Sequence, residues 1–319
     1  MKKLFSHHPE ALANTLRIAE KCGARLDLGQ PLFPSLSRDD GDTSFSALWK
    51  ESFEGLKRRY RPLTKEAVER LRRELEVIEE RGFSPYFLIV NDIGRQARRW
   101  GMRTVGRGSA ACSIVSYCLG ITHVDPLALH LHFERFLNPE RSSPPDIDLD
   151  FSWKDRDRIL KYVYEKYGED RVAMIGTHVT FAARSAVREI GKAYGLSGSE
   201  LKQFTRRIPH YGARSLTGLS EEIPECRDLP VDEEPYRTVL ALGERVAGFP
   251  RHLSLHAGGI VISPRPIPDL LPLERAATGL VITQYSMGPV EELGLIKIDL
   301  LSQRSLGVLG DAAAAVEEQ

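Results

Sequence analysis

The sequence predicts an α/β fold, of the α+β kind, with a helical insertion. Amphipathic helices are expected at 66–82 and 86–100, because apolar residues recur there at helical spacing. Strand-like segments lie at 102–105, 144–151, 259–263, 280–285 and 295–301. Between 177 and 249 the pattern is typical of helices separated by polar loops, with no convincing strands. Two blocks of mixed structure therefore flank a helical subdomain.

The helices can be justified in order along the chain. A first helix is expected at 9–23, followed by a loop rich in Pro, Gly, Ser and Asp. The helix at 66–82 places four apolar side chains on one face: Val68, Leu71, Leu75 and Ile78. The helix at 86–100 begins after Ser84-Pro85, turns Phe87, Ile89, Val90 and Ile93 to the core, and turns Arg95, Arg98 and Arg99 outward. An Ala-rich helix ends the chain.

Composition limits the classes of protein. The 319 residues carry 44 Lys plus Arg and 44 Asp plus Glu, so a surface for nucleic acid has to be local. No apolar run reaches the roughly 18 to 20 residues of a membrane helix, and the start lacks a signal-peptide core. We expect a cytoplasmic protein with no membrane partner. The four cysteines lack CxxC spacing and predict reduced thiols: Cys22, Cys112, Cys118 and Cys226.

The strongest chemical signal is an alternating acidic segment, Pro-Pro-Asp-Ile-Asp-Leu-Asp-Phe at 144–151. In a strand, Asp146, Asp148 and Asp150 would share one face, and the apolar residues between them would anchor the other. Carboxylates this close repel one another unless a cation neutralises them, and oxygen ligands favour Mg²⁺ or Mn²⁺ over Zn²⁺. The alternative is a solvated edge strand whose acidic side chains discourage aggregation.

Two further segments are weak signals alone and become more informative beside the acidic segment. In the strand at 295–301, Lys297 and Asp299 share a face, and they can form either a phosphate and metal site or an ordinary surface ion pair. The glycine-rich segment 105–113, Val-Gly-Arg-Gly-Ser-Ala-Ala-Cys-Ser, lies between a strand and a helix. Backbone N–H groups there can bind phosphate, although the segment matches neither a P-loop nor a dinucleotide-binding turn.

A basic stripe follows on the helix predicted at 181–194. Arg184, Arg188 and Lys192 recur every four residues and would lie on one face. Such a stripe either contacts a nucleic-acid backbone or forms a solvated helix surface. We name this face as the candidate DNA-binding surface.

Taken together, the motifs resemble a known family. The runs are PYFLIV (85–90), GRGS (106–109), DPL (125–127), FERFLNPER (133–141), PDIDLDF (145–151), HAGG (256–259), VITQY (281–285) and KIDLL (297–301). Their order and spacing resemble those of the bacterial DNA polymerase III alpha subunit, a C-family replicative polymerase, over nearly the whole chain. A single run of this kind would be weak support, whereas eight in one order are specific.

The resemblance implies roles for particular residues. The family's catalytic, metal-binding aspartates fall on Asp146, Asp148 and Asp299, and two Mg²⁺ ions, or Mn²⁺ in their place, would bind there. The nucleotide contacts fall on four other residues: Arg107, Gly108, Ser109 and Lys297. The implied reaction adds deoxynucleotides from deoxynucleoside triphosphates to a primer 3′-hydroxyl on primer-template DNA by two-metal phosphoryl transfer.

The resemblance also implies an organisation. The fold would be a nucleotidyltransferase-type palm, a mixed β-sheet with flanking helices, plus an inserted helical thumb. The expected parts are a helical and linker lead-in (1–50), the first part of the palm (51–177), the thumb (178–252), the second part of the palm (253–304) and the start of the fingers (305–319). Contacts with the rest of the fingers and with the sliding clamp would come from regions outside this sequence.

Two departures from the family pattern leave other functions open. Ala110 and Cys112 stand where the family usually has glycine, and their added Cβ atoms could tighten or bar the usual loop conformation. Ser302-Gln303 follows KIDLL where Gly-Leu is common. The alternatives to a weakly active polymerase core are a non-catalytic DNA-binding or scaffold remnant and an untemplated nucleotidyltransferase or metal nuclease. Retention of all three aspartates and Lys297 favours the enzyme.

Overall fold

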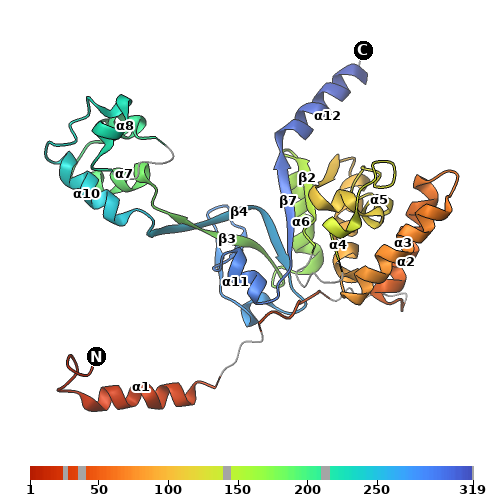
Figure 1. The fold of residues 1–319 in the computed structure, drawn as a ribbon, viewed down its shortest axis with the longest axis horizontal. Helices are drawn as coiled ribbons and strands as arrows, with labels where there is room; N and C mark the ends of the chain where they lie inside the picture. The colour runs from red at the N-terminus through yellow and green to blue at the C-terminus, as the bar shows by residue number, and fades with distance from the viewer. Residues whose placement is uncertain (24–27, 35–40, 139–144, 210–215, 318–319) are drawn as a thin grey trace.

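A mixed β-sheet forms the centre of the molecule (Figure 1). The computed structural model describes residues 1–23, 28–34, 41–138, 145–209 and 216–317. Within these residues the sheet has seven strands in the order β1-β2-β7-β4-β3-β6-β5. Their bounds are Thr104–Arg107 (β1), Asp148–Ser152 (β2), Val172–Thr180 (β3), Pro250–Ile262 (β4), Leu273–Arg275 (β5), Val281–Thr283 (β6) and Lys297–Gln303 (β7).

The strand order brings together segments that are distant in the sequence. β2 pairs in parallel with β7, while β1 lies antiparallel to β2 and β4 lies antiparallel to β7. The acidic segment and the Lys-Ile-Asp segment are therefore neighbours in the sheet. The α/β class predicted from the sequence is confirmed as a mixed sheet with many helices.

Helices from the first half of the chain pack beside β1 and β2. They are α2 (Ser44–Arg59), α3 (Lys65–Glu80), α4 (Ser84–Arg99), α5 (Ile114–Leu119) and α6 (Arg156–Tyr167). The side chains of Thr43 and Thr64 accept hydrogen bonds from backbone N–H groups in the first turns of α2 and α3. The apolar faces predicted for α3 and α4 are confirmed, because their core-facing residues are buried except for the half-buried Val68.

A separate helical body lies at the far end of a ribbon made by β3 and β4 (Figure 1). It contains α7 (Ala183–Ala193), α8 (Gly198–Arg207), α9 (Leu219–Glu222) and α10 (Tyr236–Val246). These helices bury their own apolar cluster around Val187, Phe204 and Leu240. The expected helical insertion thus has its own core, but β3 extends to Thr180 and β4 begins at Pro250. The expectation of no strand between 177 and 249 was wrong at its first residues.

Several other boundaries differ from the sequence prediction. The first strand runs to Arg107 instead of ending at 105, and β7 runs to Gln303. β5, all of β3 and the part of β4 before Gly259 were not predicted, because β5 has only three residues and β3 carries no strict alternation. Parts of two predicted segments lie outside the described residues. They are 24–27 and 35–40 of the lead-in, and 139–144, which includes Pro144 at the start of the predicted acidic strand.

The remaining helices are α1 (Pro9–Lys21), α11 (Met287–Glu292) and α12 (Arg304–Glu317). α1 and α12 confirm the helices expected near the two ends of the chain. α1 has no buried residue and α12 buries only Gly307. Across the described ranges, no helix combines the length and apolar character needed to cross a membrane.

Candidate metal and nucleotide site

The acidic segment folds as its alternation predicts. Ile147, Leu149 and Phe151 are buried in the main core, whereas the side chain of Asp146 is 51% exposed. The backbone N–H of Ile147 donates a hydrogen bond of 3.1 Å to the buried hydroxyl of Tyr86 on α4. The strand is therefore fixed on its apolar side, and its carboxylates face the opposite side.

The parallel register of β2 and β7 brings the third carboxylate into place. Asp148 and Asp299 are direct partners in the ladder, although 151 positions separate them in sequence. One carboxylate oxygen from each of Asp146, Asp148 and Asp299 lies within 4.8 Å of the other two. The three residues carried over as catalytic aspartates are thus brought together by the fold.

Two cations border the carboxylates. Nζ of Lys297 lies 2.6 Å from Oδ2 of Asp299 and 3.4 Å from Oδ1 of Asp146. Burial lowers the pKa of Lys297, but the hydrogen bond and charge of Asp299 and the charge of Asp146 outweigh it, and the net pKa is raised. This lysine stays protonated, yet a single ammonium cannot balance both carboxylates that it contacts.

Burial and neighbouring negative charge together raise the pKa of Asp148. Burial is the largest cause, followed by the negative charge of Asp146. The guanidinium of Arg107 opposes both, and Asp299 adds a further increase. Nη1 of Arg107 lies 3.6 Å from Oδ2 of Asp148. The site therefore holds more negative charge than its own cations neutralise.

One oxygen in the site has no hydrogen-bond partner among the described residues. Oδ1 of Asp299 is buried, and the side chain as a whole is 8% exposed. Nδ1 of His256 lies 3.7 Å from this oxygen, but this nitrogen accepts hydrogen bonds from the backbone N–H groups of Gly258 and Gly259. A buried carboxylate oxygen without a donor is costly, and a divalent cation would satisfy it. The oxygen-only donor set fits Mg²⁺ or Mn²⁺.

The glycine-rich segment begins at the end of β1, next to the carboxylates. A Cβ at Gly106 would come within 2.2 Å of the carbonyl oxygen of Ile121, so no larger residue fits there. Gly108 has a φ of +73°, which favours glycine, and its Cβ position lies 3.6 Å from Oδ2 of Asp148. The backbone of this turn therefore runs directly beside a predicted metal ligand.

A short 3-10 helix (Gly108–Cys112) follows the turn and leads to α5, so the segment lies between a strand and a helix, as predicted. Ala110 and Cys112, the two departures from the family pattern, are buried in the core, and neither has a positive φ. The backbone at these positions does not require glycine. All four cysteines are free thiols, and Cys22 is the exposed one.

A bulge in β4, to which the sequence pattern gave no role, supports the site. In the HAGG run, a Cβ at Gly258 would lie 2.5 Å from Leu301, and one at Gly259 would lie 2.8 Å from the ring of His256. Arg156 on α6 donates from Nη2 to the carbonyl of Ala257 (3.0 Å) and from Nε to that of Leu300 (2.7 Å). These contacts join the bulge to β7 beside Asp299. In the sequence, the adjacent glycines of the HAGG run were the signal from which this bulge could have been predicted.

The basic stripe is only partly a free surface. Arg184 is half-buried, and its guanidinium donates to the carbonyl oxygens of Ile208 and Arg206 at the end of α8. Lys192 pairs with Glu189 at 3.2 Å, while Arg188 is exposed. The three residues do lie on one helix, but Arg184 is engaged in holding the helical body together.

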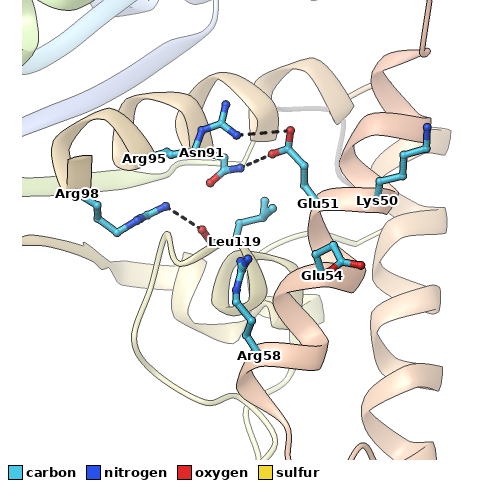
Figure 2. A pocket seen from close by; sticks show the side chains of 8 residues that line it. All are labelled: Lys50, Glu51, Glu54, Arg58, Asn91, Arg95, Arg98 and Leu119. Atoms are coloured by element: carbon cyan, nitrogen blue, oxygen red, sulfur yellow. Dashed lines mark hydrogen bonds and ion pairs between the residues drawn. The ribbon is translucent and has the colours of Figure 1, made fainter. Parts of the chain in front are cut away.

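A pocket between α2 and α4 provides a contrast with the carboxylate site (Figure 2). It has a volume of about 240 Å³ and is lined mainly by charged side chains of both signs. Figure 2 shows Glu51 bonded to Asn91 and close to Arg95, and Arg98 donating to the carbonyl of Leu119. Most of the charged groups there have partners within the protein, which is typical of a structural role.

Comparisons with known proteins agree with these motifs. Residues 46–302 match the family described as "Bacterial DNA polymerase III alpha NTPase domain". The chain is 44% identical over 317 residues to an error-prone DNA polymerase of Symbiobacterium thermophilum. It is 40% identical over 320 residues to a DNA polymerase III subunit alpha of Bacillus subtilis. With the corresponding subunit of Thermus aquaticus, the identity is 44% over 279 residues.

The matched share differs greatly between this chain and its relatives. The alignments cover 99% and 100% of this chain for the Symbiobacterium and Bacillus proteins but 29% of each relative. For the Thermus protein the shares are 84% and 23%. The chain thus spans less than a third of the length of these relatives.

Proposed function

This chain belongs to the bacterial DNA polymerase III alpha family, and from that premise we propose that it is the catalytic core of a template-directed DNA polymerase. The observation that carries the proposal is the convergence of Asp146, Asp148 and Asp299 around a buried oxygen without a donor. A charge cluster kept at this cost is typical of a functional site.

In the proposed mechanism, the three aspartates would hold two Mg²⁺ ions, for which Mn²⁺ could substitute. When bound, these ions would activate the primer 3′-hydroxyl and neutralise charge on the leaving pyrophosphate. The ammonium of Lys297 lies beside the same carboxylates and would bind phosphate oxygens of the incoming deoxynucleoside triphosphate. Arg107 and the backbone of Gly108 and Ser109 would bind the same group from β1.

The proposed architecture follows the family. The sheet with its flanking helices would be the palm, and the helical body at the end of the β3–β4 ribbon would be the thumb. Primer-template DNA would contact the exposed Arg188 and Lys192, with Arg184 contributing mainly to the packing of α7 on α8. The fingers and the sliding clamp are the proposed protein partners, in the cytoplasm.

The test is a calorimetric titration of Mn²⁺ into the chain with primer-template DNA and a deoxynucleoside triphosphate present. Asp146→Asn and Asp148→Asn should each weaken binding by about a hundredfold or more, since each removes a direct ligand. Asp269→Asn, which changes an exposed carboxylate elsewhere, is the matched control. Asp148→Asn should also abolish nucleotide addition while the chain stays folded.

The alternatives give different results in the same experiment. Equal, weak Mn²⁺ binding by the native chain and both variants, with folding intact, would favour a DNA-binding scaffold. Metal-dependent extension or cleavage of a single-stranded primer without a template would favour an untemplated nucleotidyltransferase or a nuclease. Product analysis on single-stranded and templated primers separates these outcomes.

A further inference from the structure

Asp150 shares the strand face of Asp146 and Asp148 but has different surroundings. It lies opposite the aliphatic Leu301 in the β2–β7 ladder, whereas Asp148 lies opposite Asp299. Its carboxylate is not part of the cluster of oxygens within 4.8 Å. With its side chain 9% exposed, Asp150 nevertheless carries a carboxylate in a nearly buried position.

The partner of this carboxylate is Arg107. The Nε–H of Arg107 donates to Oδ1 of Asp150 at 3.0 Å. Arg107 is the antiparallel ladder partner of Asp148, and its Nη1 lies 3.6 Å from Oδ2 of that residue. The side chain of Arg107 is 48% exposed. One edge of the planar guanidinium is thus fixed at Nε, and its remaining N–H groups are partly open to solvent.

The two aspartates therefore hold Arg107 in different ways. Asp148 contacts a terminal nitrogen at a distance longer than a good hydrogen bond, and its charge would be shared with any cation held by the cluster. Asp150 makes the shorter, charge-assisted bond from outside the cluster, so a cation bound there would leave it in place. The orientation of the guanidinium would then depend on Asp150 alone.

We propose that Asp150 is a positioning residue and not a metal ligand: it holds Arg107 so that its terminal N–H groups face the phosphates of the incoming nucleotide. The inference rests on the proposed function, because it assigns Arg107 to the triphosphate. It gives the third aspartate of the segment a role distinct from that of the other two.

The experiment compares Asp150→Ala, Asp150→Asn, Arg107→Lys and the double variant Asp150→Ala with Arg107→Lys in the whole chain. Mn²⁺ binding is measured by electron paramagnetic resonance, and binding of inorganic triphosphate in the presence of Mg²⁺ is measured by calorimetry. Asp150→Ala should keep its Mn²⁺ affinity within about twofold of the native value, the usual error of additivity between independent sites.

Triphosphate affinity should respond differently. Asp150→Ala and Arg107→Lys should each lower it about tenfold, and the double variant should lower it no further, because both single changes disable one guanidinium. Asp150→Asn should give an intermediate value, since its amide oxygen still accepts a hydrogen bond from Nε. The ¹⁵Nε–¹H resonance of Arg107 should move to a solvent-like position in Asp150→Ala and stay in place in Asp148→Asn.

Each contrary result has a distinct meaning. Loss of Mn²⁺ binding in Asp150→Ala and Asp150→Asn would make Asp150 a ligand and overturn the positioning role while leaving the proposed function intact. Additive losses in the double variant, or an unmoved Arg107 resonance in Asp150→Ala, would also overturn it. A native chain that binds neither Mn²⁺ nor triphosphate would instead contradict the proposed function itself.

Discussion

Glu74 in the helical layer and Asp299 in the sheet are both buried carboxylates, but their surroundings differ. Oε1 of Glu74 accepts from Nε of Arg70 at 2.6 Å, and Oε2 accepts from the hydroxyl of Ser113 and the backbone N–H of Val115. At Asp299, Oδ2 accepts from Lys297, and Oδ1 has no donor among the described residues.

The difference separates a structural carboxylate from one proposed to bind a metal ion. Every oxygen of Glu74 is satisfied within the fold, and the residue ties α3 to the start of α5. Burial raises the pKa of Glu74 even though Arg70 and Ser113 oppose the increase. Asp299 is left incomplete next to two further carboxylates, which is the arrangement expected of a site that awaits a ligand. Burial alone does not indicate function, whereas a buried carboxylate oxygen without a hydrogen-bond donor among the described residues, set among like charges, favours a ligand site.

The largest expected effect is on the helical side of this comparison. Glu74→Gln should lower the free energy of unfolding by about 3 to 5 kcal/mol, because the largely buried guanidinium of Arg70 loses its counter-charge. Urea unfolding followed by circular dichroism measures this. Glu54→Gln, which removes an exposed carboxylate in an (i, i+3) pair on α2, should leave the midpoint unchanged. Equal midpoints for the two variants would remove the structural role of Glu74.

The next effect lies on the sheet side. Mn²⁺ at a hundred times its dissociation constant should stabilise the native chain by about 2.7 kcal/mol, because it binds only the folded state. Asp299→Asn should abolish this increment without destabilising the metal-free chain, since Asp146 remains as a counter-charge for Lys297 and the repulsion among the carboxylates falls. Glu74→Gln should keep the full increment. Thermal unfolding with and without Mn²⁺ tests both, and an increment that survives in Asp299→Asn would show that the ion binds elsewhere.

The parts of the fold that sequence predicted well are those with strict periodicity. The apolar faces of α3 and α4 and the alternation of 145–151 each follow from one local pattern, so neighbouring residues suffice to reveal them. The ribbon of β3 and β4 was missed because its strands are held by pairing across more than seventy intervening residues, as at Gly176 and Leu255. Such pairing leaves no local signal.

The candidate site shows the same limit. The order of the motifs identified Asp146, Asp148 and Asp299 as candidate ligands. Only the parallel register explains why Asp148 lies opposite Asp299 while Asp150 lies opposite Leu301. The sequence likewise could not show that Arg184 holds the end of α8, because that contact depends on how two helices pack. Residue identity predicted a metal-binding carboxylate site, and long-range packing decided which carboxylates and cations take part in it.

The smallest expected effect is a change in the sign of a pH dependence. The folded-state pKa of Asp148 is raised above its ordinary value of 3.8, so in the metal-free chain its contribution to stability is present below that value and is lost as the pH rises through the raised pKa. With saturating Mn²⁺, the bound form requires the ionised carboxylate, and stability is lost as the pH falls. The slope attributable to Asp148 should therefore reverse.

The size of this slope is bounded by one proton, at about 1.4 kcal/mol per pH unit. Other carboxylates titrate in the same range, so the quantity to compare is the difference between native and Asp148→Asn unfolding free energies across the acidic range, with and without Mn²⁺. A difference of the same sign under both conditions would mean that Asp148 does not exchange its proton for a metal ion. The contrast with Glu74 would then rest on Asp299 alone.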